Sequence, residues 1–186
     1  MKKTFALILV VVGVGFIGGG VYTTLRGLDA KAHVREELVA QKITTPEDAS
    51  IPNAPVDDAA TAHAMAQIIN VHAAEATGGQ TYATMGRFLA ADGGDTSDEA
   101  LALKDEEGNP VANPLRNVAF QAMALQTSLH ASHLAFEVSN LVIGVGVMVF
   151  VLGFVIGGTG IALGALPLPV RVRQTDAEPA VAALAG

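Results

Sequence analysis

Two long apolar runs, separated by a polar and acidic segment, constrain this chain more than any other feature of its sequence. The first run covers residues 4–22 and the second lies within residues 137–166, whose centre at 141–163 carries no charged residue. Each run supplies the ~20 apolar residues that a helix needs to cross the ~30 Å hydrocarbon core of a bilayer. Because backbone amides find no hydrogen-bond partner in lipid, each run must be helical. The sequence therefore predicts an all-α membrane protein with two transmembrane helices and the lipid bilayer as a partner.

Basic residues predict the orientation of the two spans. Two lysines precede the first run, and two arginines follow the second within a few residues. Short flanks rich in Lys and Arg stay in the cytoplasm. We therefore expect residues 1–3 and 167–186 to be cytoplasmic at the plasma membrane, and residues 23–136 to be extracytoplasmic. The tail at 167–186 is rich in Pro and Ala, which predicts disorder.

The first run must also be weighed as a secretory signal peptide, because two lysines precede it. Its apolar part is longer than a typical signal core, and no Ala-x-Ala cleavage site follows the glycines at 18–20. We expect the run to be retained as a membrane anchor.

The composition of the segment at 23–136 excludes some classes of function. It carries seven Lys or Arg and fifteen Asp or Glu residues. Nucleic-acid binding needs a basic surface, so this balance argues against a nucleic-acid partner. The chain has no cysteine, which excludes disulfides, thiolate metal sites and thiol chemistry.

Further helices are predicted between the two runs. The first span can continue as a helix to Lys42, and the three prolines of residues 43–56 then predict an extended loop. Asp57 or Asp58 can cap a helix that ends at Ala76. These segments would form a small extracytoplasmic helical domain.

The remaining part of the extracytoplasmic segment leads to a helix start at Asn113 and Pro114. A short helix is expected around residues 81–90, followed by an acidic, glycine-rich insertion at 91–113 that we expect to be a mobile surface loop. Asn113 and Pro114 are typical of a helix start, and no break follows before Pro167. One helix of roughly fifty residues is therefore predicted. Its outer half carries a seam that should pack on the other two helices, at Leu115, Val118, Ala122, Leu125, Leu129, Ser132 and Phe136.

Small residues form a stripe on one face of the second span. Its members are Gly146, Gly153, Gly157, Gly160 and Gly164. The first span offers Gly15 and Gly19 at a matching four-residue interval. Such stripes let helix backbones approach closely in lipid. We predict a specific helix contact, and the pattern leaves open whether its partner is the first span or another protein.

Histidines supply the main candidates for chemistry. His130, His133 and Glu137 share one helix face and could hold a divalent metal or relay protons. The alternative is a solvated face beside the packed seam, with Glu137 at headgroup depth. We favour that second interpretation and expect no metal and no cofactor. His63 and His72 lie nine residues apart on opposite sides of one helix, so they cannot chelate one ion together.

A turn near residue 78 is the other candidate site. Gly78 suits the left-handed position that ends a helix. His72 sits on the apolar face of that helix with Glu75 three residues on, which favours a histidine hydrogen-bonded within a small core. We predict that this turn and its neighbours form an interaction surface or a fixed corner. The residues are His72, Glu75, Thr77, Gly78, Gly79 and Tyr82.

Two segments carry a family resemblance. Residues 41–49 (QKITTPEDA) and 72–83 (HAAEATGGQTYA) resemble motifs of small actinobacterial membrane proteins with two spans, which are often labelled aromatic ring-opening dioxygenases. The resemblance covers roughly residues 2–166 and implies two spans around a helical domain. Ring-opening dioxygenases are soluble iron enzymes, and no iron-binding set of side chains is evident here.

These observations together predict a non-enzymatic role. We expect an accessory or scaffolding subunit of an actinobacterial membrane or cell-envelope complex, of which a respiratory complex is one example. Its partners would be other membrane-protein subunits or further copies of itself. The alternative is a metal- or haem-associated membrane protein that uses His130, His133 and Glu137. An enzyme is disfavoured because the sequence offers no activated nucleophile or acid–base pair.

Overall fold

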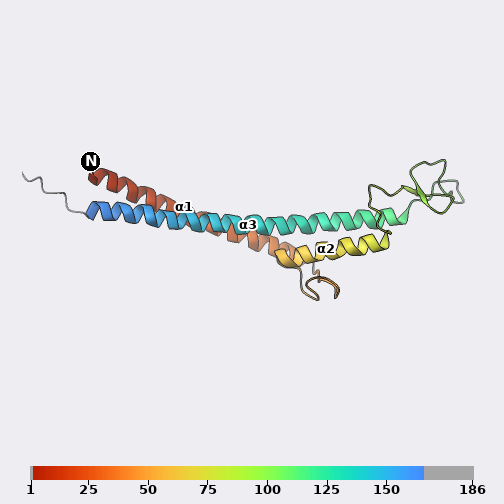
Figure 1. Cartoon of the computed structure of the whole chain (residues 1–186), viewed down its shortest axis with the longest axis horizontal. Coiled ribbons are helices and arrows are strands. Elements are labelled where there is room, and N and C mark those ends of the chain that lie inside the picture. The colour runs from red at the N-terminus through yellow and green to blue at the C-terminus, as the bar shows by residue number, and fades with distance from the viewer. Residues whose placement is uncertain (1, 166–186) are drawn as a thin grey trace, which may run out of the picture.

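The computed structural model of this chain describes residues 2–165. Three helices and two short strands follow one another: α1 (Lys2–Ala40), α2 (Ala59–Ala76), β1 (Phe88–Leu89), β2 (Asp95–Thr96) and α3 (Pro114–Ala165). The molecule is a long, thin rod in which α1 and α2 lie along successive stretches of α3 (Figure 1). Residue 1 and the tail at 167–186, for which we predicted cytoplasmic disorder, lie outside the described residues.

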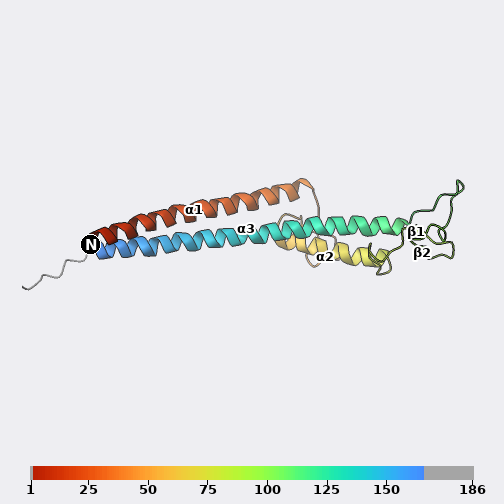
Figure 2. The ribbon, with the colours of Figure 1, turned by 90° about the horizontal axis from the view of Figure 1, so that it is seen from above.

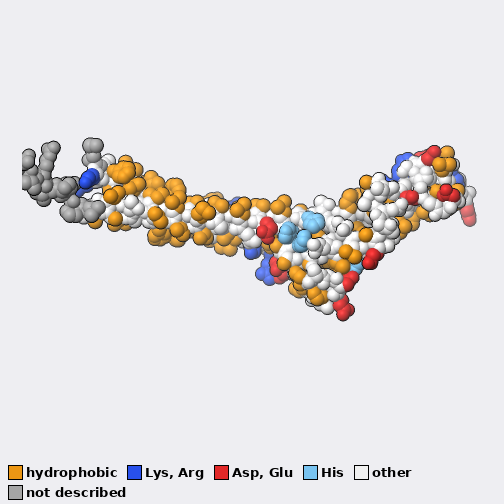
Figure 3. Space-filling view, in the orientation of Figure 1, with side chains coloured by type: hydrophobic (Ala, Val, Ile, Leu, Met, Phe, Trp, Pro, Cys, Tyr) orange, Lys and Arg blue, Asp and Glu red, His pale blue; other side chains and the backbone are white. Residues whose placement is uncertain are grey.

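The two longest helices, α1 and α3, form an antiparallel pair. α1 has 39 residues and α3 has 52. At a rise of 1.5 Å per residue, α3 is about 78 Å long. The start of α1 and the end of α3 lie together at one end of the rod (Figures 1 and 2). Both helices are long and apolar enough to cross a membrane, and apolar side chains cover much of the surface at that end (Figure 3).

The helix ends form where local sequence signals predicted them. Asp58 caps α2, because its carboxylate accepts a hydrogen bond from the Thr61 backbone N–H at 2.8 Å, while the Thr61 hydroxyl oxygen accepts one from Asp58 N–H at 3.2 Å. At the other end, Gly79 N–H donates to the Ala74 carbonyl at 2.7 Å, and Gly78 has a φ of 62°. This is a Schellman ending, in which a residue without a Cβ occupies the left-handed position.

The start of α3 also agrees with its sequence signal. Asn113 Oδ1 accepts a hydrogen bond from the Leu115 backbone N–H at 3.0 Å, and Pro114 is the first helical residue. Proline is tolerated there because a first-turn N–H has no helical partner in any case. The prediction of one long unbroken helix through the second apolar run is confirmed.

A small core lies where the outer parts of the helices meet. It is formed by side chains from α1, the loop after it, α2 and α3: Leu38, Val56, Ala62, Ala66, Leu129 and Phe136. Nearer the predicted membrane surface, Lys31 Nζ donates a hydrogen bond to Asn140 Oδ1 at 2.9 Å and so links α1 to α3.

The predicted seam of α3 is only partly covered. Leu129 and Phe136 are buried as expected, but Leu115, Val118 and Leu125 remain 41%, 40% and 52% exposed. The reason is the length of α1, which ends two residues after Leu38, at the level of Leu129 in the shared core. Beyond that level α3 has α2 on one side and no second helix among residues 2–165 to cover the rest of its seam.

Two local predictions were wrong. Residues 81–90 form turns and the strand β1 instead of a helix, and the acidic insertion is a folded β structure. β1 and β2 pair antiparallel, with further bridges from Ala90 to Ala102 and from Lys104 to Pro110. The acidic side chains make the turns themselves: Asp105 Oδ1, for example, accepts a hydrogen bond from Asn109 N–H at 2.7 Å. The fold is therefore mostly helical, with a small β appendage, and the expectation of an all-α protein needs that correction.

Candidate functional site

The apolar parts of α1 and α3 are in very close contact. Small residues meet in pairs that recur every seven residues on both helices: Ala6 with Gly160, Gly13 with Gly153, Gly20 with Gly146, and Gly27 with Ser139. A Cβ added to Gly160 would lie 2.8 Å from the Ala6 carbonyl oxygen. No real Cβ sits that close, so the backbones can approach in this way only because these residues are so small.

The predicted glycine face of α3 is therefore directed at α1. Gly146, Gly153 and Gly160 each have backbone atoms of α1 within 3.0 Å of an added Cβ. The Gly157 backbone is also close to α1, since its N would lie 2.5 Å from a Cβ on Gly13, but a Cβ on Gly157 or Gly164 itself would lie at ordinary contact distances of 3.7 and 3.6 Å. The helix that packs on the glycine stripe is therefore α1, the first span, which the sequence alone left open.

The prediction for α1 was wrong. A Cβ on Gly15 or Gly19 would meet nothing within 4 Å, so neither residue packs on α3. Gly13, Gly20 and Gly27 do so instead. A seven-residue stride keeps a residue on one seam of two coiled helices, and Gly15 stands two residues, or about 200°, away from Gly13. The matching seven-residue strides were the signal that could have identified this contact from the sequence.

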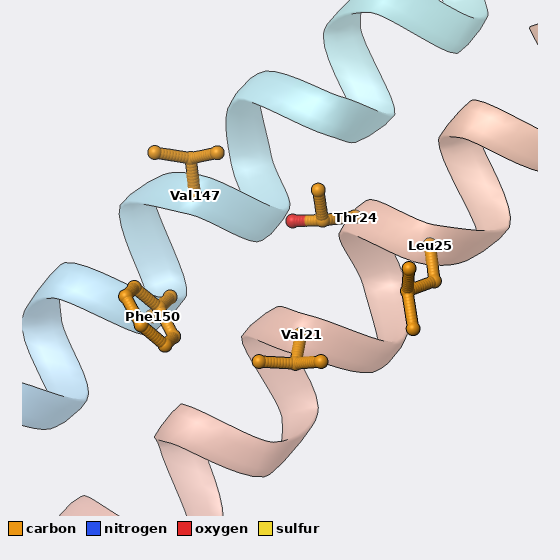
Figure 4. A pocket seen from close by; sticks show the side chains of 5 residues that line it. All are labelled: Val21, Thr24, Leu25, Val147 and Phe150. Carbon is orange, nitrogen blue, oxygen red and sulfur yellow. The ribbon is translucent and has the colours of Figure 1, made fainter.

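A hollow of about 230 Å³ flanks this helix contact. It is lined by Val21, Thr24, Leu25, Val147 and Phe150 (Figure 4). The Thr24 hydroxyl lies between the helices, donates to the Gly20 carbonyl at 2.9 Å and would collide with a Cβ on Gly146. Its polar group is thus satisfied within α1, and the remaining lining is apolar.

The two segments that carry the family resemblance meet in the structure. His72 Nε2 lies 2.7 Å from Asp48 Oδ2, across the junction between α2 and the preceding loop. The hydrogen bond from His72 holds the pKa of the Asp48 carboxyl below its usual range. Both side chains are about half exposed. The prediction that His72 lies in a small core was therefore wrong, and Glu75 is exposed as well.

The turn after α2 is a fixed corner that folds back on α3. The buried Thr77 Oγ1 lies 2.8 and 2.7 Å from the Ala73 and Gln80 carbonyl oxygens, which share its single O–H donor. The Arg116 guanidinium lies 4.0 Å from the centre of the Tyr82 ring. Such a cation–π contact stabilises the position of the ring on α3. The two glycines of the corner have no neighbour within 4 Å of an added Cβ, so they serve the turn and leave its surface open.

Two grooves border α3 outside the apolar parts of the helices. One, of about 380 Å³, lies between the corner, α2 and α3. The other, of about 510 Å³, lies where α1 ends and is here called the seam groove. Its lining combines apolar and polar side chains: Glu37, Leu38, Gln41, Ile43, Met65, Ile69, Leu125, Ser128, Leu129 and Ser132.

Three histidines gather where α2 begins against α3. The His63 ring on α2 is centred 5.0 Å from that of His133 and 6.0 Å from that of His130, both on α3. Figure 3 shows histidine side chains in one patch on this face of the rod. Of the predicted metal candidates, Glu137 is exposed one turn further along α3. Sequence reasoning missed His63, because only the packing of α2 on α3 brings it to the other two.

The chain was compared with protein-family models, with curated proteins and with solved structures, and none of the three comparisons found a match.

Proposed function

We propose that this protein is a non-enzymatic accessory or scaffolding subunit of a membrane or cell-envelope complex, of the actinobacterial type that its loop motifs resemble. In this proposal α1 and α3 form a membrane hairpin with both chain ends in the cytoplasm. The outer part of α3, with α2 and the β appendage, stands outside the membrane. A respiratory complex is one assembly of this kind.

The main support for this proposal is the part of the α3 seam that no other helix covers. Leu115, Val118 and Leu125 expose 40 to 52% of their surface in the part of the helix that would stand in water. Further large apolar side chains are exposed on the same part of α3, namely Phe120, Met123 and Leu134. Leu115, Val118 and Leu125 share one face of α3, and large apolar side chains that are exposed to water along one face are typical of a protein interface.

The seam groove indicates the chemistry of the partner. Leu125 and Leu129 line it from α3 together with Ser128 and Ser132, and Glu37 lines it from α1. A groove that combines apolar and polar side chains suits an amphipathic helix. We therefore assign the groove to a helix of another membrane-anchored subunit, which would take the place that α1 leaves empty beyond Ala40.

Site-specific photocrosslinking in native membranes tests this assignment. A photoreactive amino acid at Leu125 should crosslink to one discrete membrane protein that co-purifies in stoichiometric amount in mild detergent. Leu125→Lys should abolish that co-purification, because the amine cannot be buried in an apolar contact without a large desolvation cost.

Thr127 supplies the matched control. It is exposed two residues further along α3 and points about 200° away from Leu125. A probe at Thr127 should give no such crosslink. A product of twice the mass of this chain would show self-association and overturn the assignment to a different subunit, and equal crosslinking from both positions would overturn the groove as an interface.

A further inference from the structure

We infer that His63, His130 and His133 form a binding site for a divalent transition metal that joins α2 to α3. The site is distinct from the seam groove and does not depend on the proposed subunit role. It also differs from the set suggested by sequence alone, because one ligand comes from a second helix.

The first observation concerns the orientation of His133. Its Nδ1 lies 2.9 Å from the backbone carbonyl oxygen of Ala59, the first residue of α2. A carbonyl oxygen only accepts, so Nδ1 carries the proton and Nε2 is left with a free lone pair. Metal-binding histidines are commonly held in this way, with one ring nitrogen donating to a carbonyl and the other directed to the ion.

The second observation concerns His63. Its Nδ1 is buried and has no hydrogen-bond partner within residues 2–165. A buried polar atom without a partner is costly and rare in folded proteins. A metal ion bound at that nitrogen would satisfy it and would use the lone pair that the neutral ring already offers.

The spacing of the three rings suits a shared ion. Two imidazoles on one tetrahedral zinc, with Zn–N bonds of ~2.1 Å, have ring centres about 5 Å apart. The ring centres here are 5.0 and 6.0 Å from His63. His130 and His133 are one helical turn apart, so both lie on the face of α3 that meets α2.

Binding requires the His63 and His130 rings to turn, while His133 keeps its hydrogen bond to Ala59 and the helices stay where they are. With the side chains in their present rotamers, no group of three or more His, Asp or Glu residues within 2–165 could hold a metal ion. Rotation about the side-chain bonds of His63 and His130 would direct a free nitrogen of each ring to the point that His133 Nε2 already faces. Water would complete the coordination, and Glu137 stands one turn beyond as a further oxygen ligand. Neutral imidazoles without thiolates favour Zn²⁺, Cu²⁺ or Ni²⁺ over Mg²⁺ or Ca²⁺.

Zinc titration of the full chain tests the inference. The protein is purified in detergent without a polyhistidine tag, stripped with a chelator and titrated calorimetrically with Zn²⁺ at pH 7.5. We expect one equivalent to bind and the thermal unfolding temperature to rise with zinc concentration, because the ion binds the folded helix pair preferentially. Mg²⁺ should have no such effect.

The chain offers its own matched controls, since it has five histidines in all. His63→Gln, His130→Gln and His133→Gln should each raise the dissociation constant for zinc at least tenfold. His33→Gln and His72→Gln should leave it unchanged, because His33 lies exposed on α1 and His72 bonds to Asp48. Circular dichroism of each metal-free variant confirms that its helices are intact.

Two results would overturn the inference. One is the lack of stoichiometric zinc binding by the unsubstituted protein. The other is tight binding that survives His63→Gln, which would place any metal on α3 alone and remove the link between the helices.

Discussion

Gly13 and Gly153 are in backbone contact across the helix pair: a Cβ on Gly153 would lie 2.7 Å from the Gly13 carbonyl oxygen, and one on Gly13 would lie 2.8 Å from the Gly153 carbonyl oxygen. The same relationship recurs one heptad away on each side. In lipid, where apolar side chains gain nothing from leaving the solvent, close packing of this kind is a main source of helix association. The contact therefore explains why α1 and the second half of α3 stay paired.

Gly153→Ala should weaken the helix pair. The added methyl group meets backbone atoms, which cannot move aside as a flexible side chain can, so we expect a loss of about 1–3 kcal/mol in pairing free energy. Unfolding in detergent, followed by the distance between spin labels on α1 and α3, measures the effect. Gly158→Ala is the control in the same helix, because a Cβ there meets nothing within 4 Å. Equal stability of the two variants would contradict the packing argument.

Gly157→Ala gives a finer test on the same face of α3. Its Cβ would lie 3.7 Å from the Gly13 Cα, which is an ordinary contact. Alanine also favours a helix over glycine by up to about 1 kcal/mol. We therefore expect this variant to be as stable as the natural protein or slightly more stable, in the same unfolding measurement.

Asp58→Ala should destabilise α2 by about 1 kcal/mol, because it removes the side chain that accepts from the Thr61 backbone N–H. Hydrogen exchange of the first-turn amides of α2 measures the change. Asp58→Asn keeps an acceptor oxygen at the cap and should retain most of the stability. Faster exchange throughout α3 in the alanine variant would indicate a global effect and contradict a simple capping role.

The same cap predicts a response to acid. Hydrogen bonds to the carboxylate, first from the Thr61 backbone N–H and then from the Thr61 hydroxyl, hold the pKa of Asp58 below its usual value of 3.8. A carboxyl whose pKa is lower in the folded state contributes stability above 3.8, and this contribution is lost as the pH falls through the folded pKa. Stability measured from pH 6 to pH 2 should therefore fall less steeply in Asp58→Asn than in the natural protein.

The proposed orientation can be tested with single cysteines, because the chain has none of its own. A cysteine at Glu106, which is exposed in the β appendage, should react with an impermeant thiol reagent in intact cells. A cysteine at Thr175 should react only after the membrane is opened. The reverse pattern would contradict cytoplasmic chain ends.

Helix ends were predictable from the sequence because each depends on residues close together in the chain. Asp58 bonds three residues ahead, Gly79 bonds five residues back, and Asn113 bonds two residues ahead. The β appendage was missed although its turns are equally local. Its acidic composition indicated solvation, and the Asp side chains that build the turns were interpreted as a sign of mobility.

What the sequence determines by itself is the presence of two apolar helices and the positions where the helices begin and end, because hydropathy and capping are local properties. Tertiary structure decided which small residues touch and which histidines meet. Gly13 rather than Gly15 contacts Gly153 because the supercoil of two long helices selects a seven-residue stride. His63 lies beside His133, seventy positions later in the chain, only because α2 packs on α3. The seven-residue strides of small residues are visible within each helix, but which helix faces which, and the meeting of His63 with His133, follow only from the packing of segments far apart in the chain.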